Sequence, residues 1–173
     1  MNLQSSHRFY LIVDLGIITA VVNLLLNGAI AWTAFQSLLY VPLWGVQSIS
    51  SDILGTTFML PFITFLFITP LARREVYRKR FPAIEFPRRL YQVLDIAPDS
   101  TILRAFIVGI FSLIIFGPIS LLILSMLDIS HLSFNHFVVF KAIFASGLGI
   151  IATPIIGLLS IGGSLTNRTL SNC

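Results

Sequence analysis

A dense basic segment between two pairs of long apolar runs constrains this chain more than any other sequence feature. The segment 73–89 holds seven of the eleven Lys and Arg residues of the chain. Basic residues in short loops stay on the cytoplasmic side of a membrane and thereby orient the spans beside them. The sequence therefore predicts that this segment is cytoplasmic and that the apolar runs on both sides of it cross a bilayer.

The composition also favours a membrane protein. Apolar residues make up 56% of the 173 residues and charged residues only 10%, whereas a soluble domain carries about 25% charged residues. Too few polar side chains remain to cover a soluble surface. The basic residues are concentrated in one segment instead of being spread over a face with aromatic residues, which argues against a nucleic-acid-binding protein.

Four apolar runs are long enough to span a membrane. A helix needs about 20 residues to cross a hydrocarbon core of about 30 Å. The four runs cover about 9–35, 53–71, 102–127 and 136–161, with a basic loop at 72–101 between the second and the third. We therefore predict an all-α fold: one domain over 1–173, an integral membrane bundle of four transmembrane helices. Both termini are expected in the cytoplasm, and the expected location is the bacterial inner (plasma) membrane.

Local signals refine the expected helices. Ser51 or Asp52 is predicted to cap the second helix, because either side chain can accept a hydrogen bond from a free backbone N–H of the first turn. The prolines Pro61, Pro118 and Pro154 lie inside the second, third and fourth spans, where they predict kinks.

Small and weakly polar residues recur every three or four positions along three of the spans. Such stripes let helices approach closely inside a membrane, so we expect them to face other helices while large apolar residues face lipid. The stripes comprise Gly16, Ala20, Asn23, Asn27, Ala31 and Ala34; Ala105, Gly109, Ser112 and Ser120; and Ala142, Ser146, Gly149, Thr153, Gly157 and Ser160.

Three polar residues of the first span form a candidate polar path, Asp14, Asn23 and Asn27. Ionisable groups at membrane depth are energetically costly, which makes them functional candidates. For the two asparagines the alternative is a purely structural role as hydrogen-bonding glue between helices. For Asp14 the alternative is an ion pair with an arginine at the inner membrane surface, Arg73, Arg74 or Arg104.

A second candidate group is expected near the outer surface, where three helix ends converge: Asp52, Asp128, His131, His136 and Lys141. Pairing of Lys141 with Asp52 or Asp128 would keep its charge compensated. The histidines and aspartates include metal-ligand types, but their spacing matches no metal signature. We therefore predict neither a metal site nor a cofactor.

The basic segment is also a candidate lipid contact. Clustered basic side chains beside a span attract anionic headgroups by about 1 kcal/mol per residue. The candidate contacts are Arg73, Arg74, Arg78, Lys79, Arg80, Arg88 and Arg89.

No sequence pattern indicates catalysis. The chain has no nucleophile elbow, no phosphate-binding glycine-rich loop and no paired acid and base, so we expect a protein that is not an enzyme. The polar stripe favours a permease-like transporter or channel that acts as a homo-oligomer. The alternative is a non-catalytic accessory or assembly subunit of a larger membrane complex.

Overall fold

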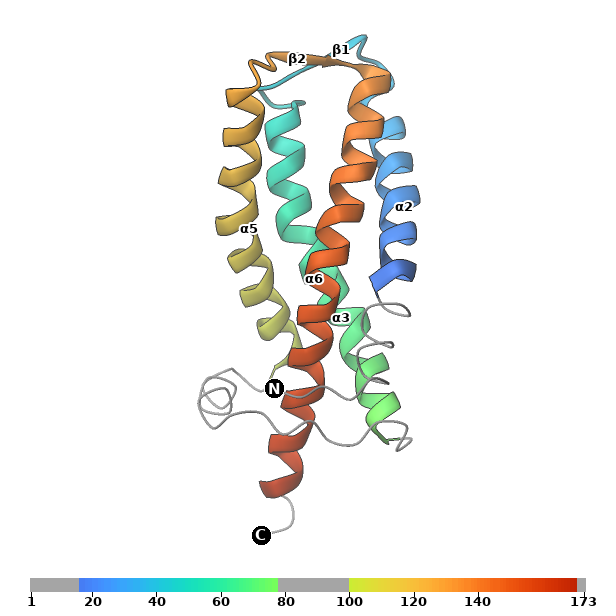
Figure 1. Cartoon of the computed structure of the whole chain (residues 1–173), viewed down its shortest axis with the longest axis vertical. Coiled ribbons are helices and arrows are strands. Elements are labelled where there is room, and N and C mark those ends of the chain that lie inside the picture. Colours follow the sequence, from blue (N-terminus) through green and yellow to red (C-terminus); the bar gives the residue numbers. More distant parts are fainter. Residues whose placement is uncertain (1–15, 78–99, 171–173) are drawn as a thin grey trace.

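The computed structural model describes residues 16–77 and 100–170, which form four long helices and two short strands. Figure 1 shows the helices side by side, with the strands lying across one end. We call this end the strand end and the opposite one the far end. In chain order the elements are α2 (Ile18–Phe35), β1 (Tyr40–Pro42), α3 (Ile49–Tyr77), α5 (Thr101–Met126), β2 (His131–Ser133) and α6 (Phe134–Leu170).

Each of the four helices is long and apolar enough to cross a membrane. The qualifying stretches contain 18 to 26 residues, and 18 helical residues extend for about 27 Å. These lengths are consistent with the predicted integral membrane protein. The stretches are Ile18–Phe35, Ile49–Leu71, Thr101–Met126 and Phe134–Gly157.

The helices do not pack in chain order. α2 packs along α6, α6 packs along α3, and α3 packs along α5. In Figure 1, α6 lies beside α2 and crosses in front of α3, while α5 lies on the other side of α3. The arrangement is therefore a row of helices, in which α2 has its main helix contacts with α6 and not with α3.

Most residues of the predicted small-residue stripes lie at these helix contacts. On α5, Ala105, Gly109 and Ser112 of the expected stripe are buried, whereas Ser120 is only partly buried. On α2 the stripe is buried from Ala20 onward but ends differently from the prediction, because Phe35 is buried and Ala34 is exposed. Large apolar side chains cover the outer surfaces, as expected for residues that face lipid; examples are Leu25, Phe111 and Ile143.

Two strands join the helix hairpins at the strand end. β1 and β2 pair antiparallel, with Val41 opposite Leu132. The sheet continues into the flanking loops, where the backbone N–H of Leu43 donates to the carbonyl of Ser130 at 2.8 Å. The described residues are mostly helical, in line with the prediction, and this short sheet is an addition that the sequence did not predict. Each strand has only three residues, too few to produce the alternating pattern by which strands are recognised in sequence.

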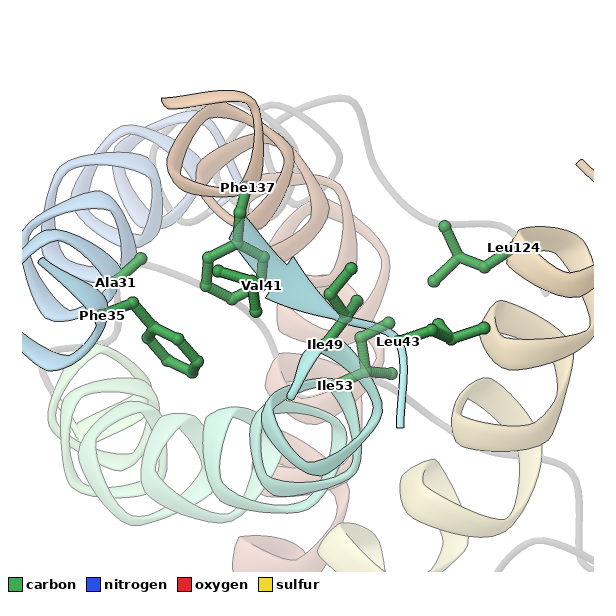
Figure 2. Packing of buried hydrophobic residues seen from close by; sticks show 8 residues of the cluster. All are labelled: Ala31, Phe35, Val41, Leu43, Ile49, Ile53, Leu124 and Phe137. Carbon is green, nitrogen blue, oxygen red and sulfur yellow. The ribbon is translucent and has the colours of Figure 1, made fainter. Parts of the chain in front are cut away.

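An apolar cluster lies beneath the strands and holds the two hairpins together. The rings of Phe35 on α2 and Phe137 on α6 have centroids 4.6 Å apart. Figure 2 shows Leu124 of α5 directed toward Leu43, so all four helices and the strand region contribute to this core. The buried members are Ala31, Phe35, Val41, Leu43, Ile49, Ile53, Leu124 and Phe137.

The helix α3 begins four residues before the predicted start of the second span. The backbone N–H of Ser51 donates to Oγ of Ser48 at 3.2 Å, and the N–H of Ser48 donates to Oγ of Ser51 at the same distance. This reciprocal pair occupies the positions of a capping box, with Ser48 as the cap. The predicted cap was wrong, since Ser51 and Asp52 lie within the first turn.

The remaining helix ends differ from the prediction by varying amounts. The α5 helix starts and ends within one residue of the predicted 102–127, whereas α6 starts at Phe134 and continues to Leu170, beyond the predicted end at 161. Residues 9–15 of the first predicted span lie outside the described residues. Pro61, Pro118 and Pro154 lie inside continuous helices, and the kinks stay predictions.

Candidate functional site

Two buried asparagines lie on the face of α2 that packs against α6. Asn23 and Asn27 are each 8% exposed. The side-chain amide of Asn27 donates to the backbone carbonyl of Asn23 at 3.1 Å, within the same helix. Asn23 instead approaches α6, where a Cβ added to Gly149 would lie 2.7 Å from its Nδ2 atom. The absence of a side chain at Gly149 therefore makes room for the amide of Asn23.

A buried ion pair joins α3 to α6. The ammonium group of Lys141 donates a hydrogen bond to Oδ1 of Asp52, and their side chains are only 5% and 13% exposed. Asp52 lies in the first turn of α3, where the partial positive charge of the helix N-terminus favours a carboxylate. Of the two pairings that the sequence left open for Lys141, the structure contains the one with Asp52.

The asparagines and the ion pair border the same cavity, which we call the α2–α3 cavity. Its volume is about 330 Å³, within the usual range of about 300–1,000 Å³ for small-molecule sites. Two residue groups that the sequence suggested separately thus meet at one place. The lining residues are Asn23, Leu26, Asn27, Ile30, Ser51, Asp52, Gly55, Thr56, Met59, Leu60, Ile63, Thr64 and Lys141.

The cavity follows α3 from its first turn to just beyond Pro61. Ser51 and Thr64 are thirteen positions apart, which corresponds to about 20 Å along a helix. The cavity therefore extends from near the strand end to the middle of the helices.

Most polar lining residues of the cavity are buried, whereas most of its apolar lining residues are partly exposed. Thr56, Thr64 and the two asparagines are buried, as is Lys141. In contrast, four apolar lining side chains are roughly half exposed on the outer surface: Leu26, Ile30, Met59 and Ile63. The cavity therefore has a polar interior and an apolar rim.

Beyond the cavity, toward the far end, the helices are closed by apolar packing. Phe65 and Ile68 of α3 form a buried cluster with Ala152 and Ile156 of α6, and Ala105 of α5 joins it. One turn further, the hydroxyl groups of Thr69 on α3 and Ser160 on α6 lie within hydrogen-bonding distance, at 3.0 Å. This contact fixes α3 against α6 on the far side of the apolar cluster.

The other residues of the predicted outer cluster have separate surroundings. Nδ1 of His131 is 3.0 Å from the hydroxyl of Ser130, and Nδ1 of His136 is 2.9 Å from that of Ser133. Asp128 is exposed and adopts a positive φ of 52° in the turn after α5. Within residues 16–77 and 100–170, no group of three or more His, Cys, Asp or Glu residues is arranged to hold a metal ion.

Other predicted site residues fall partly outside the described structure. Asp14 lies outside the described residues, so its place in a polar path or an ion pair stays a prediction. Arg73 and Arg74 belong to the last turns of α3, and the side chain of Arg74 is exposed. The remaining candidate lipid contacts also lie outside the described residues: Arg78, Lys79, Arg80, Arg88 and Arg89.

Several cavity residues on α3 were not predicted. Thr56, Leu60 and Thr64 continue from the predicted Asp52 at steps of four, so all four residues share one face of the helix. The same spacing rule that selected Asn23 on the first span would have found this stripe. It was missed because Leu60 interrupts the polar pattern.

Comparison of the chain with protein-family models, with curated proteins and with solved structures finds no match. The fold itself supports a class: four apolar helices suggest a membrane protein and are consistent with insertion as an integral one. Within that class, the most distinctive feature of the described residues is a cavity that contains a buried ion pair.

Proposed function

We propose that the protein is a permease-like transporter and that the α2–α3 cavity is its solute site. The observation that carries the proposal is the buried ion pair of Asp52 and Lys141 at the wall of a cavity of about 330 Å³. Charged groups between helices of membrane-spanning length are costly and commonly mark a solute or ion pathway. A concave site with a few converging polar groups is also the usual form of a small-molecule site.

The proposed orientation places the strand end outside the cell. The basic residues that follow α3 then lie in the cytoplasm, in agreement with the positive-inside rule, and so do both termini. In this orientation, in a bacterial inner membrane, the cavity lies in the outer half of the helices. The apolar cluster around Ala152 closes the inner half, and we assign this conformation to the outward-facing state of the proposed transport cycle.

Transport requires the inner half to open while the outer half closes. Pro61 in α3 and Pro154 in α6 each remove one backbone hydrogen bond from the two helices that form the closure. Bending at these positions is the proposed motion. The proposed unit is a homo-oligomer, because a neighbouring copy would cover the open side of the cavity between α2 and α3.

The alternative, a non-catalytic accessory subunit, receives no specific support. Its proposed docking surfaces were the small-residue stripes. Most of these positions, including Ala31 and Gly109, are already buried inside the chain itself, so they cannot at the same time receive a partner helix. Enzymatic activity is not part of the proposal.

Labelling of introduced thiols tests whether the cavity and the inner closure become accessible from opposite sides of the membrane. This test does not require the solute to be known. The chain has one native cysteine, Cys173, so Cys173→Ser provides a cysteine-free background. Gly55→Cys places a thiol in the cavity wall without a clash, since a Cβ there meets no atom within 4 Å. Ala152→Cys places a second thiol in the inner closure with little change in size. Each variant is treated, in right-side-out and inverted vesicles, with a membrane-impermeant sulfonate-bearing thiosulfonate reagent.

We expect the thiol at position 55 to react from outside and the thiol at position 152 to react from inside. Gly147→Cys is the matched control, because position 147 is also exposed and also free of atoms within 4 Å but does not line the cavity. It should stay unreactive from both sides. If the thiol at position 152 never reacts from inside, the inner half does not open, and this result would contradict the transporter proposal.

A further inference from the structure

The ion pair in the cavity has unused hydrogen-bonding capacity. An ammonium group carries three donors and a carboxylate four acceptor positions. Within residues 16–77 and 100–170, Oδ1 of Asp52 is the one hydrogen-bond acceptor found for Nζ of Lys141. Both residues line the cavity. A bound molecule can therefore accept a hydrogen bond from Lys141 and donate one to Asp52 while the pair stays together.

The charge of the cavity selects against simple ions. Asp52 and Lys141 are the two charged residues of its lining, so their charges cancel. A monovalent ion would bring an uncompensated charge into a buried site between apolar helices, which is costly. A molecule that carries one positive and one negative group adds no net charge, and each of its groups lies beside its complement.

The apolar rim of the cavity requires that a bound molecule also has an apolar part. The half-exposed side chains of Leu26, Ile30, Met59 and Ile63 form the rim, so part of a bound molecule contacts hydrocarbon. At about 30 Å³ for each water, 330 Å³ corresponds to the volume of about eleven waters. That space fits a small molecule or a lipid headgroup, but not a whole phospholipid.

We propose that the α2–α3 cavity binds a small zwitterion with an apolar part, its ammonium group beside Asp52 and its anionic group beside Lys141. The inference deepens the proposed transport function by naming the substrate class of the same site. The same chemistry is offered by a free amphipathic zwitterion and by a zwitterionic lipid headgroup whose acyl chains leave through the apolar rim.

Protection of a cavity thiol measures this binding directly. Full-length protein carrying Gly55→Cys and Cys173→Ser is placed in nanodiscs of phosphatidylglycerol and treated with the sulfonate-bearing thiosulfonate reagent. The probes are leucine, 3-methylbutylamine, which lacks the carboxylate, and 4-methylpentanoate, which lacks the ammonium group. The three compounds are compared at the same concentration. We expect leucine to slow modification of the thiol at least fivefold, and each single-charge compound to slow it less than twofold.

A second arm separates the two sources of the zwitterion. Without leucine, the modification rate is compared in nanodiscs of phosphatidylethanolamine and of phosphatidylglycerol. Protection by leucine supports a free zwitterion, and slower modification in phosphatidylethanolamine supports a headgroup. Absence of both effects, or protection by a single-charge compound equal to that by leucine, overturns the proposal.

Neutralising one partner of the ion pair should change which of the three compounds the cavity prefers. This change distinguishes a binding site from a merely structural ion pair. With Lys141→Gln the remaining carboxylate should favour 3-methylbutylamine over leucine, and with Asp52→Asn the remaining ammonium should favour 4-methylpentanoate. A structural pair predicts no such reversal, so an unchanged order of the three compounds overturns the proposal. If a single variant fails to fold, the double variant Asp52→Asn with Lys141→Gln leaves no buried charge, and leucine protection should fall to the level of the single-charge compounds.

The experiments distinguish failure of the transport proposal from failure of the zwitterion proposal. Leucine protection at position 55 without inside access at position 152 would retain the zwitterion site and reject transport. Access from both sides without protection by either zwitterion would retain transport and reject this substrate class.

Discussion

The amide of Asn23 on α2 occupies the space that a side chain at Gly149 on α6 would fill. A Cβ at residue 149 would lie 2.7 Å from Nδ2 of Asn23 and 3.6 Å from its Cγ. The first distance is shorter than real Cβ contacts. The present position of the Asn23 amide therefore depends on glycine at residue 149.

Gly149→Ala should destabilise the protein, because Asn23 must leave its present rotamer or α2 must move away from α6. Overpacking of this kind costs about 1–3 kcal/mol. The free energy of unfolding in mixed detergent micelles measures the loss. The matched control is Gly147→Ala, two residues earlier, where a Cβ meets nothing within 4 Å. Equal stabilities for the two variants would contradict the described contact.

Loss of one partner of the buried ion pair should have a larger effect. Asp52→Asn leaves the ammonium of Lys141, whose side chain is 5% exposed, without its carboxylate. Breaking a buried pair in this way costs about 3–5 kcal/mol. The same unfolding measurement applies. Asp128→Asn is the control, because Asp128 is exposed and asparagine tolerates its positive φ.

Much of the fold could be predicted from the sequence, because membrane helices leave strong local signals. Apolar length located the four helices, and small-residue spacing located most of their contact faces. The order of packing, with α2 on α6 and α3 on α5, left no such signal, since similar stripes can pair in several ways. The strands were missed for a related reason, because three-residue strands are defined by pairing between distant segments.

The candidate site was predicted in pieces but not as a unit. Asn23 and Asn27 were selected for their depth in the first span, and Asp52 and Lys141 for their charge near the outer surface. That all four line one cavity follows from the crossing of α2, α3 and α6, which residue spacing within one helix cannot reveal.

The contact between α3 and α5 should also depend on a glycine. A Cβ at Gly109 would lie 2.9 Å from the ring of Phe58 and 3.1 Å from its backbone oxygen. The ring can rotate, but the backbone oxygen moves only with the helix. Gly109→Ala should therefore lower the unfolding free energy by about 1–3 kcal/mol, whereas Gly55→Ala, which meets no atom within 4 Å, should have little effect.

The hydroxyl contact between Thr69 and Ser160 lies beyond the apolar cluster of Phe65, Ile68, Ala152 and Ile156, toward the far end. Under the transport proposal, this contact should stabilise the outward-facing state over one that opens inward. Interhelical hydrogen bonds in membrane proteins contribute about 0.6 kcal/mol on average and at most about 1.7. A double-mutant cycle of Thr69→Val and Ser160→Ala should return a coupling free energy in this range.

Thr69→Val nearly preserves the volume of the side chain, so the hydroxyl is lost with little change in the space that the side chain fills. Ser160 also donates a hydrogen bond to the carbonyl of Ile156 at 2.8 Å, and because Thr69 takes no part in that bond, the substitution should affect only the contact between helices. Because a weaker closure would raise the population of the proposed inward-open form, the thiol of Ala152→Cys should react faster from inside in the Thr69→Val background. A coupling free energy near zero together with an unchanged reaction rate would show that the apolar cluster alone holds the inner half closed.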